Sequence, residues 1–118
     1  MNRIPLGEQL GAYCITSDDG QRVYDQIHPL LREKQPVLLD FSGVQIVASP
    51  FLNAAIGQLL RDLDSETLNT YLKFENLASG SKPILRRVIE NAKRYYTDPA
   101  YRAAVNKVMT AFSEGEDD

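Results

Sequence analysis

The hydrophobic and polar positions of this chain predict strands that alternate with helices. Residues 37–41 are almost entirely apolar, which predicts a central strand that is buried on both faces. Residues 70–74 alternate between apolar and polar, and residues 10–16 also read as a strand. Residues 4–6 add an edge strand, a position where Pro5 is tolerated.

Apolar residues at helical spacing follow or separate these strands. Residues 50–63 carry the clearest apolar stripe and predict a helix over that range. After a loop at residues 78–81, two more helices are predicted at residues 83–96 and 99–112, the last with Asp98 as its N-cap.

A proline interrupts the first helical pattern, which begins after a polar turn at residues 17–20. Apolar residues at helical spacing follow that turn, at Val23, Ile27, Leu30 and Leu31. Pro29 lies inside the pattern, where it removes a backbone donor and clashes with the preceding turn. We therefore expect either a kink or two short helices in this segment.

Strands that alternate with helices indicate an α/β fold. Helical crossovers join strands in parallel, whereas the two N-terminal strands are expected to form an antiparallel hairpin. The prediction is a small mixed sheet of about four strands with helices packed on it. The chain has 118 residues, an ordinary length for one domain, which we place at residues 1–112. The acidic tail at residues 113–118 is predicted to be disordered.

Composition argues against several classes of protein. No apolar run approaches the roughly 20 residues of a membrane span, and the N-terminus lacks the apolar core of a signal peptide. One cysteine, Cys14, excludes an internal disulfide, and one histidine, His28, argues against a zinc site. We expect Cys14 to be buried as a small hydrophobe and His28 to lie at the surface or its boundary. Together these features favour a cytoplasmic protein with no metal and no cofactor.

The net charge of −3 is unevenly distributed along the chain. Residues 82–107 carry seven basic and two acidic residues, and their candidate anion-binding patch is Arg86, Arg87, Lys93 and Arg94. Such a segment can bind an anionic partner, but it is also an ordinary solvated helix face. The alternative function is therefore nucleic-acid binding by the basic helices at residues 83–112. The overall acidic balance, with a pI of about 5.1, argues against nucleic acid as the partner.

The loop after the central strand holds the candidate working surface. Asp40 ends the strand, Gly43 lies in a small turn, and Ser49 and Pro50 open the next helix. Partners of open α/β sheets meet such loops. Asp40 is expected to accept hydrogen bonds from backbone N–H groups of the turn at residues 42–43. No nucleophile–base pair appears near it, so no catalytic residue is predicted.

This block resembles the STAS domain, the module of anti-sigma-factor antagonists, and it is more similar still to the uncharacterised bacterial STAS-like domains. The resemblance rests on two motifs, Leu39-Asp40-Phe41-Ser42-Gly43-Val44 and Ser49-Pro50-Phe51-Leu52. It implies a non-enzymatic protein-interaction module in bacterial cytoplasmic signalling or regulation. The partner that it implies is a protein, such as a kinase-type ATPase regulator.

Ser49 has two interpretations. In phosphorylatable STAS proteins a serine at this position receives phosphate from a partner kinase, and the added charge would break an interface. Alternatively, Ser49 only caps the helix, with Pro50 at its first position. The acidic residue that usually precedes this serine is Ala48 here, and the small residue that usually follows it is Pro50. These departures favour the cap.

Phe51 and Asn53 complete the predicted partner-binding surface, together with Asp40, Gly43, Ser49 and Pro50. The apolar stripe of the helix claims Leu52, and neighbouring residues on an ideal helix do not face the same way. Phe51 is therefore expected to be partly exposed beside Ser49, as an anchor for a partner.

Overall fold

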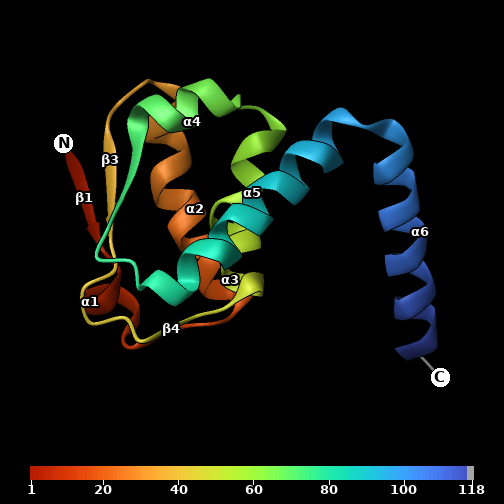
Figure 1. The fold of residues 1–118 in the computed structure, drawn as a ribbon, viewed down its shortest axis with the longest axis horizontal. Helices are drawn as coiled ribbons and strands as arrows, with labels where there is room; N and C mark the ends of the chain where they lie inside the picture. Colours follow the sequence, from red (N-terminus) through yellow and green to blue (C-terminus); the bar gives the residue numbers. More distant parts are fainter. Residues whose placement is uncertain (117–118) are drawn as a thin grey trace.

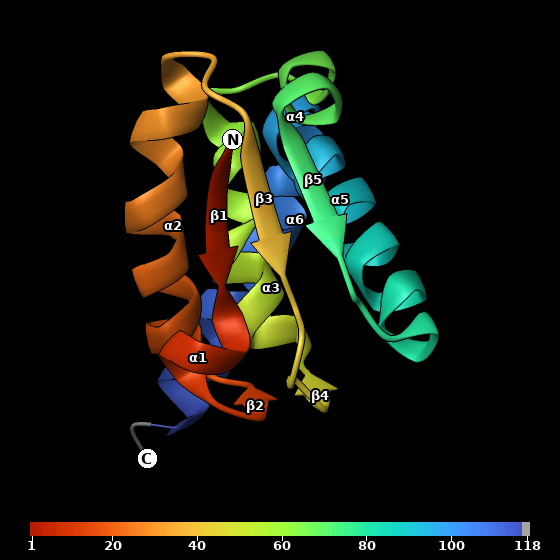
Figure 2. The same ribbon diagram turned by 90° about the vertical axis from the view of Figure 1, so that its left-hand side faces the viewer.

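The computed structural model describes the backbone of residues 1–116 and the side chains of residues 1–107. Three strands form one parallel sheet in the order β1-β3-β5: β1 (Asn2–Pro5), β3 (Val37–Asp40) and β5 (Leu72–Glu75). The helices lie along one side of this sheet (Figure 1), and Figure 2 shows its other face uncovered. The α/β class predicted from the sequence is confirmed.

A second sheet pairs β2 (Tyr13–Cys14) with β4 (Ile46–Val47), again in parallel. The predicted antiparallel hairpin of N-terminal strands is therefore wrong, and the described residues form five strands in two sheets. The reason is a short helix, α1 (Leu6–Leu10), followed by Gly11 with φ of +87°. This turn removes the start of the predicted strand 10–16 and directs β2 away from β1.

Helix α2 (Ser17–Arg32) continues through Pro29, so the predicted division into two short helices is wrong. Thr16 caps its start, since the Thr16 side chain accepts a hydrogen bond from the Asp19 backbone N–H at 3.1 Å. Pro29 lies only one turn before the helix ends, so few hydrogen bonds follow it. Burial of the apolar face, with Ile27 and Leu31 fully covered, stabilises the helix around it.

The predicted helix 50–63 is divided into α3 (Ser49–Ala55) and a 3-10 helix, η1 (Gly57–Arg61). The break falls at Ile56, whose φ of −113° departs from regular helix. A further helix that the sequence did not predict, α4 (Ser65–Tyr71), follows. Its last two residues, Thr70 and Tyr71, lie inside the predicted strand 70–74, which therefore starts late, at Leu72.

The C-terminal part is helical, as predicted. A 3-10 turn, η2 (Ser79–Ser81), leads into α5 (Lys82–Thr97), and α6 (Pro99–Glu116) follows. Asp98 caps α6, because its Oδ1 accepts a hydrogen bond from the Tyr101 backbone N–H at 3.1 Å. The helix extends over residues 113–116 of the tail that was expected to be disordered, and residues 117–118 of that tail lie outside the described residues.

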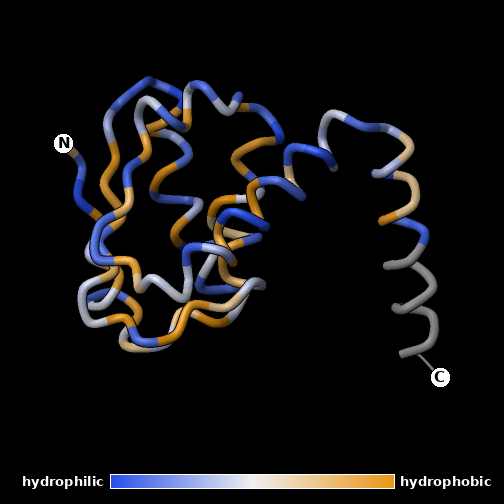
Figure 3. Tube along the Cα trace, viewed as in Figure 1, coloured by the Kyte–Doolittle hydropathy of each residue, from blue (hydrophilic) through white to orange (hydrophobic). Residues whose placement is uncertain are grey.

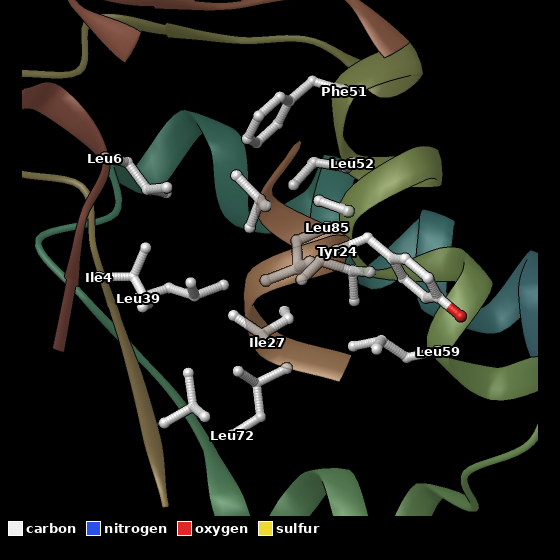
Figure 4. Packing of buried hydrophobic residues seen from close by; sticks show 14 of the residues in the cluster. Ile4, Leu6, Tyr24, Ile27, Leu39, Phe51, Leu52, Leu59, Leu72 and Leu85 are labelled. Carbon is white, nitrogen blue, oxygen red and sulfur yellow. The ribbon is translucent and has the colours of Figure 1, made fainter. Parts of the chain in front are cut away.

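The core lies between the main sheet and the helices. In Figure 3 the strand β3 and the inner turns of the helices are coloured as hydrophobic, whereas the loops between them are largely hydrophilic. Leu39 and Leu72 from the strands point toward Ile27 of α2 (Figure 4). Leu38, on the opposite face of β3, is only half-buried. The prediction that the central strand is buried on both faces is wrong, because the helices cover one face only.

Candidate functional site

The carboxyl ends of the main strands open onto one edge of the molecule, which we call the carboxyl edge. Helix α1, the β2–β4 sheet and the loop that joins β3 to β4 gather there (Figure 2). The strands β2 and β4 lead directly into α2 and α3, so both of these helices start at this edge. The edge therefore brings together segments that are far apart in the sequence.

Asp40 organises the polar side of this edge. Its side chain is 3% exposed, and its Oδ1 accepts hydrogen bonds from the Ser42 backbone N–H and from Asn76 Nδ2, both at 2.9 Å. The Arg3 guanidinium pairs with Oδ2, and Asn76 Nδ2 also donates to Ser42 Oγ at 3.0 Å. The predicted contact between Asp40 and the turn after it is confirmed. This network joins β1, β3 and the loop after β5.

The same network holds Asp40 in its charged form. The hydrogen bonds from Asn76 and from the Ser42 backbone N–H, with Arg3 beside them, lower the pKa of Asp40 from 3.8 to about 2. A carboxylate with so low a pKa is a poor general base near neutral pH. Asn76 was missed as a partner because it is 36 residues away in sequence. Its one local signal is its position just after a strand, where it adopts a φ of +61°, a region in which Asn is enriched.

Phe51 does not lie at the surface, so its predicted role as an exposed anchor is wrong. Its side chain is 1% exposed, and that of the adjacent Leu52 is fully buried. Both point into the core (Figure 4). Helix α3 packs against both α2 and α5. A helix that is covered on more than one side buries more than a single stripe, so neighbouring residues can both be inside.

Ser49 is exposed and does not cap the helix. Ala48 occupies the capping position, and α3 begins with Ser49 and Pro50 as its first residues. The Ser49 hydroxyl makes no capping hydrogen bond, so the predicted cap is wrong. Pro50, Asn53 and Gly43 are also exposed. Four of the six predicted partner-binding residues therefore lie at the surface, whereas Asp40 and Phe51 are buried.

Large hydrophobic side chains are exposed at the carboxyl edge. Tyr13 and Ile46 lie opposite each other in the β2–β4 sheet and are 55% and 48% exposed, and Ile15 is 42% exposed. The alternate residues, Cys14 and Val47, point into the core. We call Tyr13, Ile15 and Ile46 the β2–β4 patch. Tyr13 and Ile15 lie within the strand that the sequence predicts over residues 10–16, but no sequence pattern shows that Ile46 lies beside them.

The predicted basic patch lies on α5, where Arg86, Arg87, Lys93 and Arg94 are all exposed. The Arg94 guanidinium carbon lies 4.3 Å from the centroid of the Tyr101 ring, at the start of α6. A cation–π contact of this kind occupies one face of the ring within the chain. Arg94, one residue of the predicted basic patch, therefore connects α5 with α6 in the structure.

Two further residues that the sequence singled out have structural contacts. Cys14 is fully buried, and burial, with a smaller effect from the Asp19 charge, raises the pKa of its thiol to about 11. His28 Nε2 lies 2.8 Å from Asp62 Oδ2, and its ring stacks on Tyr24. Among the described residues, no group of three or more His, Cys, Asp or Glu side chains is placed to hold a metal ion.

Comparison with known proteins identifies a family. The family model described as a STAS-like domain of unknown function (DUF4325) matches residues 19–82, from the first turn of α2 to the start of α5. This match covers more than half of the chain. No curated protein and no solved structure matches. None of the helices in the described part of the chain has the length and apolar character needed to span a bilayer.

Proposed function

Because the chain belongs to the family of STAS-like domains of unknown function, we propose that it is a non-enzymatic protein-interaction module of bacterial cytoplasmic signalling or regulation. Its partner is a protein that binds at the carboxyl edge, on the β2–β4 patch and the adjoining start of α3. A kinase-type ATPase regulator is the partner class that the STAS resemblance implies.

The β2–β4 patch is the observation that carries this proposal. Tyr13 and Ile46 are directly opposed on neighbouring strands, and both side chains are about half exposed. Protein interfaces place aromatic and aliphatic anchors at their centre and polar residues at their rim. Here the exposed Ser49 and Asn53 supply polar side chains on the helix that follows β4. We therefore assign the role of interface anchor, which the sequence suggested for Phe51, to Tyr13 and Ile46.

Ser49 is the position where this interface is regulated. Its hydroxyl is exposed in the first turn of α3 and makes no capping hydrogen bond. A phosphate there would add about −1.5 to −2 charges beside an apolar contact surface. Such a charge would oppose burial of the β2–β4 patch against a partner, because the phosphate would lose its hydration.

Affinity capture with matched variants tests the proposal. Wild-type protein, Ile46→Lys and Gln35→Lys are immobilised and incubated with lysate of the source bacterium, and the retained proteins are quantified by mass spectrometry. Gln35 is exposed in the loop just before β3, at the opposite edge of the sheet from Ile46. We expect a partner retained by wild type and by Gln35→Lys and lost with Ile46→Lys. The two lysine variants should have the same melting temperature.

The captured partner then needs to be measured in purified form. We expect Ile46→Lys to weaken its affinity tenfold or more, about 1.4 kcal/mol. Equal affinity for all three proteins would contradict binding at the β2–β4 patch. Recovery of a partner without a kinase-type ATPase domain would still support a protein-interaction function. It would contradict only the proposed class of partner.

A further inference from the structure

Helix α6 stands apart from the rest of the molecule, as Figure 1 shows. We call residues 1–97, which contain the sheets and helices α1–α5, the body. Within the described part of the chain, α5 is the element against which α6 packs most extensively. The family match ends at residue 82, so α6 lies outside the part of the chain that the family model describes.

Contacts at the junction between α5 and α6 keep α6 away from the body. The Arg102 side chain donates hydrogen bonds to the last carbonyls of α5, from Nε to the Tyr95 oxygen at 3.0 Å and from Nη2 to the Tyr96 oxygen at 2.9 Å. The Tyr95 hydroxyl donates to Asn106 Oδ1 at 2.7 Å, and Arg94 lies over the ring of Tyr101. These contacts fix the angle at which α6 leaves the body, so α6 cannot close onto it without breaking them.

A cleft of about 260 Å³ lies between α6 and the body. Its body wall combines the polar side chains of Asn53 and Gln58 with Ala92, Tyr95 and Tyr96 of α5, and its α6 wall is formed by Tyr101 and Val105. Tyr95, Tyr96, Tyr101 and Val105 are all only partly buried around this cleft, so burying them further against an apolar surface would be favourable. The cleft therefore offers apolar surface on both walls to a further helix.

The sequence of α6 continues this apolar pattern. Apolar residues recur at positions 101, 105, 108, 109 and 112, and small Ala residues flank them at positions 104 and 111. A helix with one apolar side must bury that side against another element. We propose that the cleft is occupied by α6 of a second copy of this chain, in a two-fold symmetric dimer with the two α6 helices antiparallel. This dimer is independent of the partner proposed above.

Charge identifies the second copy as the occupant. The junction carries exposed cations, Lys93, Arg94 and Arg102, whereas the last turn of α6 carries Glu114 and Glu116. Arg102 and Glu114 are twelve positions apart in α6, which separates them by about 18 Å along the helix. This exceeds the Debye length of about 8 Å at physiological salt, so the two charge groups do not neutralise each other within one chain.

An antiparallel pair of α6 helices brings the two charge groups together. The acidic end of α6 in each copy then lies beside the basic junction of the other copy. Because of the two-fold symmetry, this contact occurs twice in each dimer. A parallel pair would instead place like charges together, which is unfavourable. Apolar pattern and charge pattern therefore favour the same arrangement.

Sedimentation equilibrium of the full chain tests this dimer. We expect the wild-type mass to rise from the single-chain value of 13.2 kDa toward twice that value as concentration increases to several hundred micromolar. Val105→Glu should remain a single chain over the same range. Ala103→Glu is the matched control, because Ala103 is exposed and two residues from Val105, on the other side of the helix. That variant should dimerise like wild type.

Two outcomes overturn the dimer: a wild-type mass of one chain at every concentration, or equal association of Val105→Glu and Ala103→Glu. Far-UV circular dichroism of dilute samples, in which all variants are single chains, checks that their melting curves agree. The double variant Glu114→Lys/Glu116→Lys tests the orientation of the helices. We expect it to weaken association at least tenfold, and an unchanged dissociation constant would overturn the antiparallel pairing.

Discussion

Gly20 of α2 lies directly against the backbone of Phe51 of α3. A Cβ placed on Gly20 would be 2.3 Å from the Phe51 carbonyl oxygen and 2.8 Å from the Ala54 Cβ. The absence of a side chain at residue 20 therefore sets how closely the two helices approach. This close approach covers one side of α3 and helps to bury Phe51.

Gly20→Ala should destabilise the fold by about 1–3 kcal/mol, the usual cost of overpacking. At an unstrained helix position the same change would stabilise by up to about 1 kcal/mol, so the sign of the effect reports the helix contact. Urea denaturation measures the free energy of unfolding. Gly80→Ala is the control, because a Cβ there would meet no atom within 4 Å. A more stable Gly20→Ala protein would contradict this packing.

Phe51→Ala should lower the free energy of unfolding by about 3–5 kcal/mol, because it removes a large buried ring and leaves a cavity. Ile46→Ala, at a side chain that is 48% exposed, should change it by no more than about 0.5 kcal/mol. Thermal and chemical denaturation of both variants provide the comparison. If Phe51→Ala were as stable as wild type, the burial of Phe51 in the core would be refuted.

Asp40 should contribute stability that depends on pH. Its pKa falls from 3.8 to about 2 on folding, so the folded protein favours the carboxylate more than the unfolded chain does. The contribution is fully present above pH 4 and is lost as pH falls through about 2. Asp40→Asn should therefore be less stable than wild type at neutral pH, and the difference should shrink in acid. Denaturation midpoints across that pH range measure it, and a constant difference would argue against the network around Asp40.

Thr16 and Ser49 give opposite predictions for helix capping. Thr16 accepts a hydrogen bond from the Asp19 backbone N–H, so Thr16→Ala should cost about 1 kcal/mol. Ser49 makes no capping hydrogen bond and is exposed, so Ser49→Ala should change stability by less than about 0.5 kcal/mol. Melting curves of the two variants, recorded side by side, compare these values. Equal losses would show that Ser49 caps α3 in solution.

Ser49→Asp should separate stability from partner binding. A negative charge in the first turn of α3 interacts favourably with the helix dipole, so the melting temperature should be unchanged or slightly raised. Once the protein partner is identified, its affinity should fall by a factor of ten or more, about 1.4 kcal/mol. Titration calorimetry of wild type and variant gives this ratio. An unchanged affinity would place Ser49 outside the interface.

Local patterns in the sequence predicted much of this protein. The buried strand at Val37–Asp40, the helices on both sides of Asp98 and the cap that Asp98 provides follow from residue periodicity and from side chains that bond to nearby backbone. The hydrogen bond from the Ser42 N–H to Asp40 joins residues only two positions apart, so it could also be predicted from the local sequence. The STAS-like motif lies within one continuous stretch, and the family it suggested is confirmed.

Tertiary packing decided the rest. The helix α4 was missed because its short sequence lacks a clear apolar stripe, although Asp64 caps it by accepting a hydrogen bond from the Thr67 backbone N–H. The parallel pairing of β2 with β4, the contact of Asn76 with Asp40 and the burial of Phe51 all join segments that are about 30 residues or more apart. Periodicity shows which side of one element is apolar, but it does not show how many neighbours cover that element. The exposed pair of Tyr13 and Ile46 therefore exists only in the folded chain, because the pairing of distant strands places these two residues side by side.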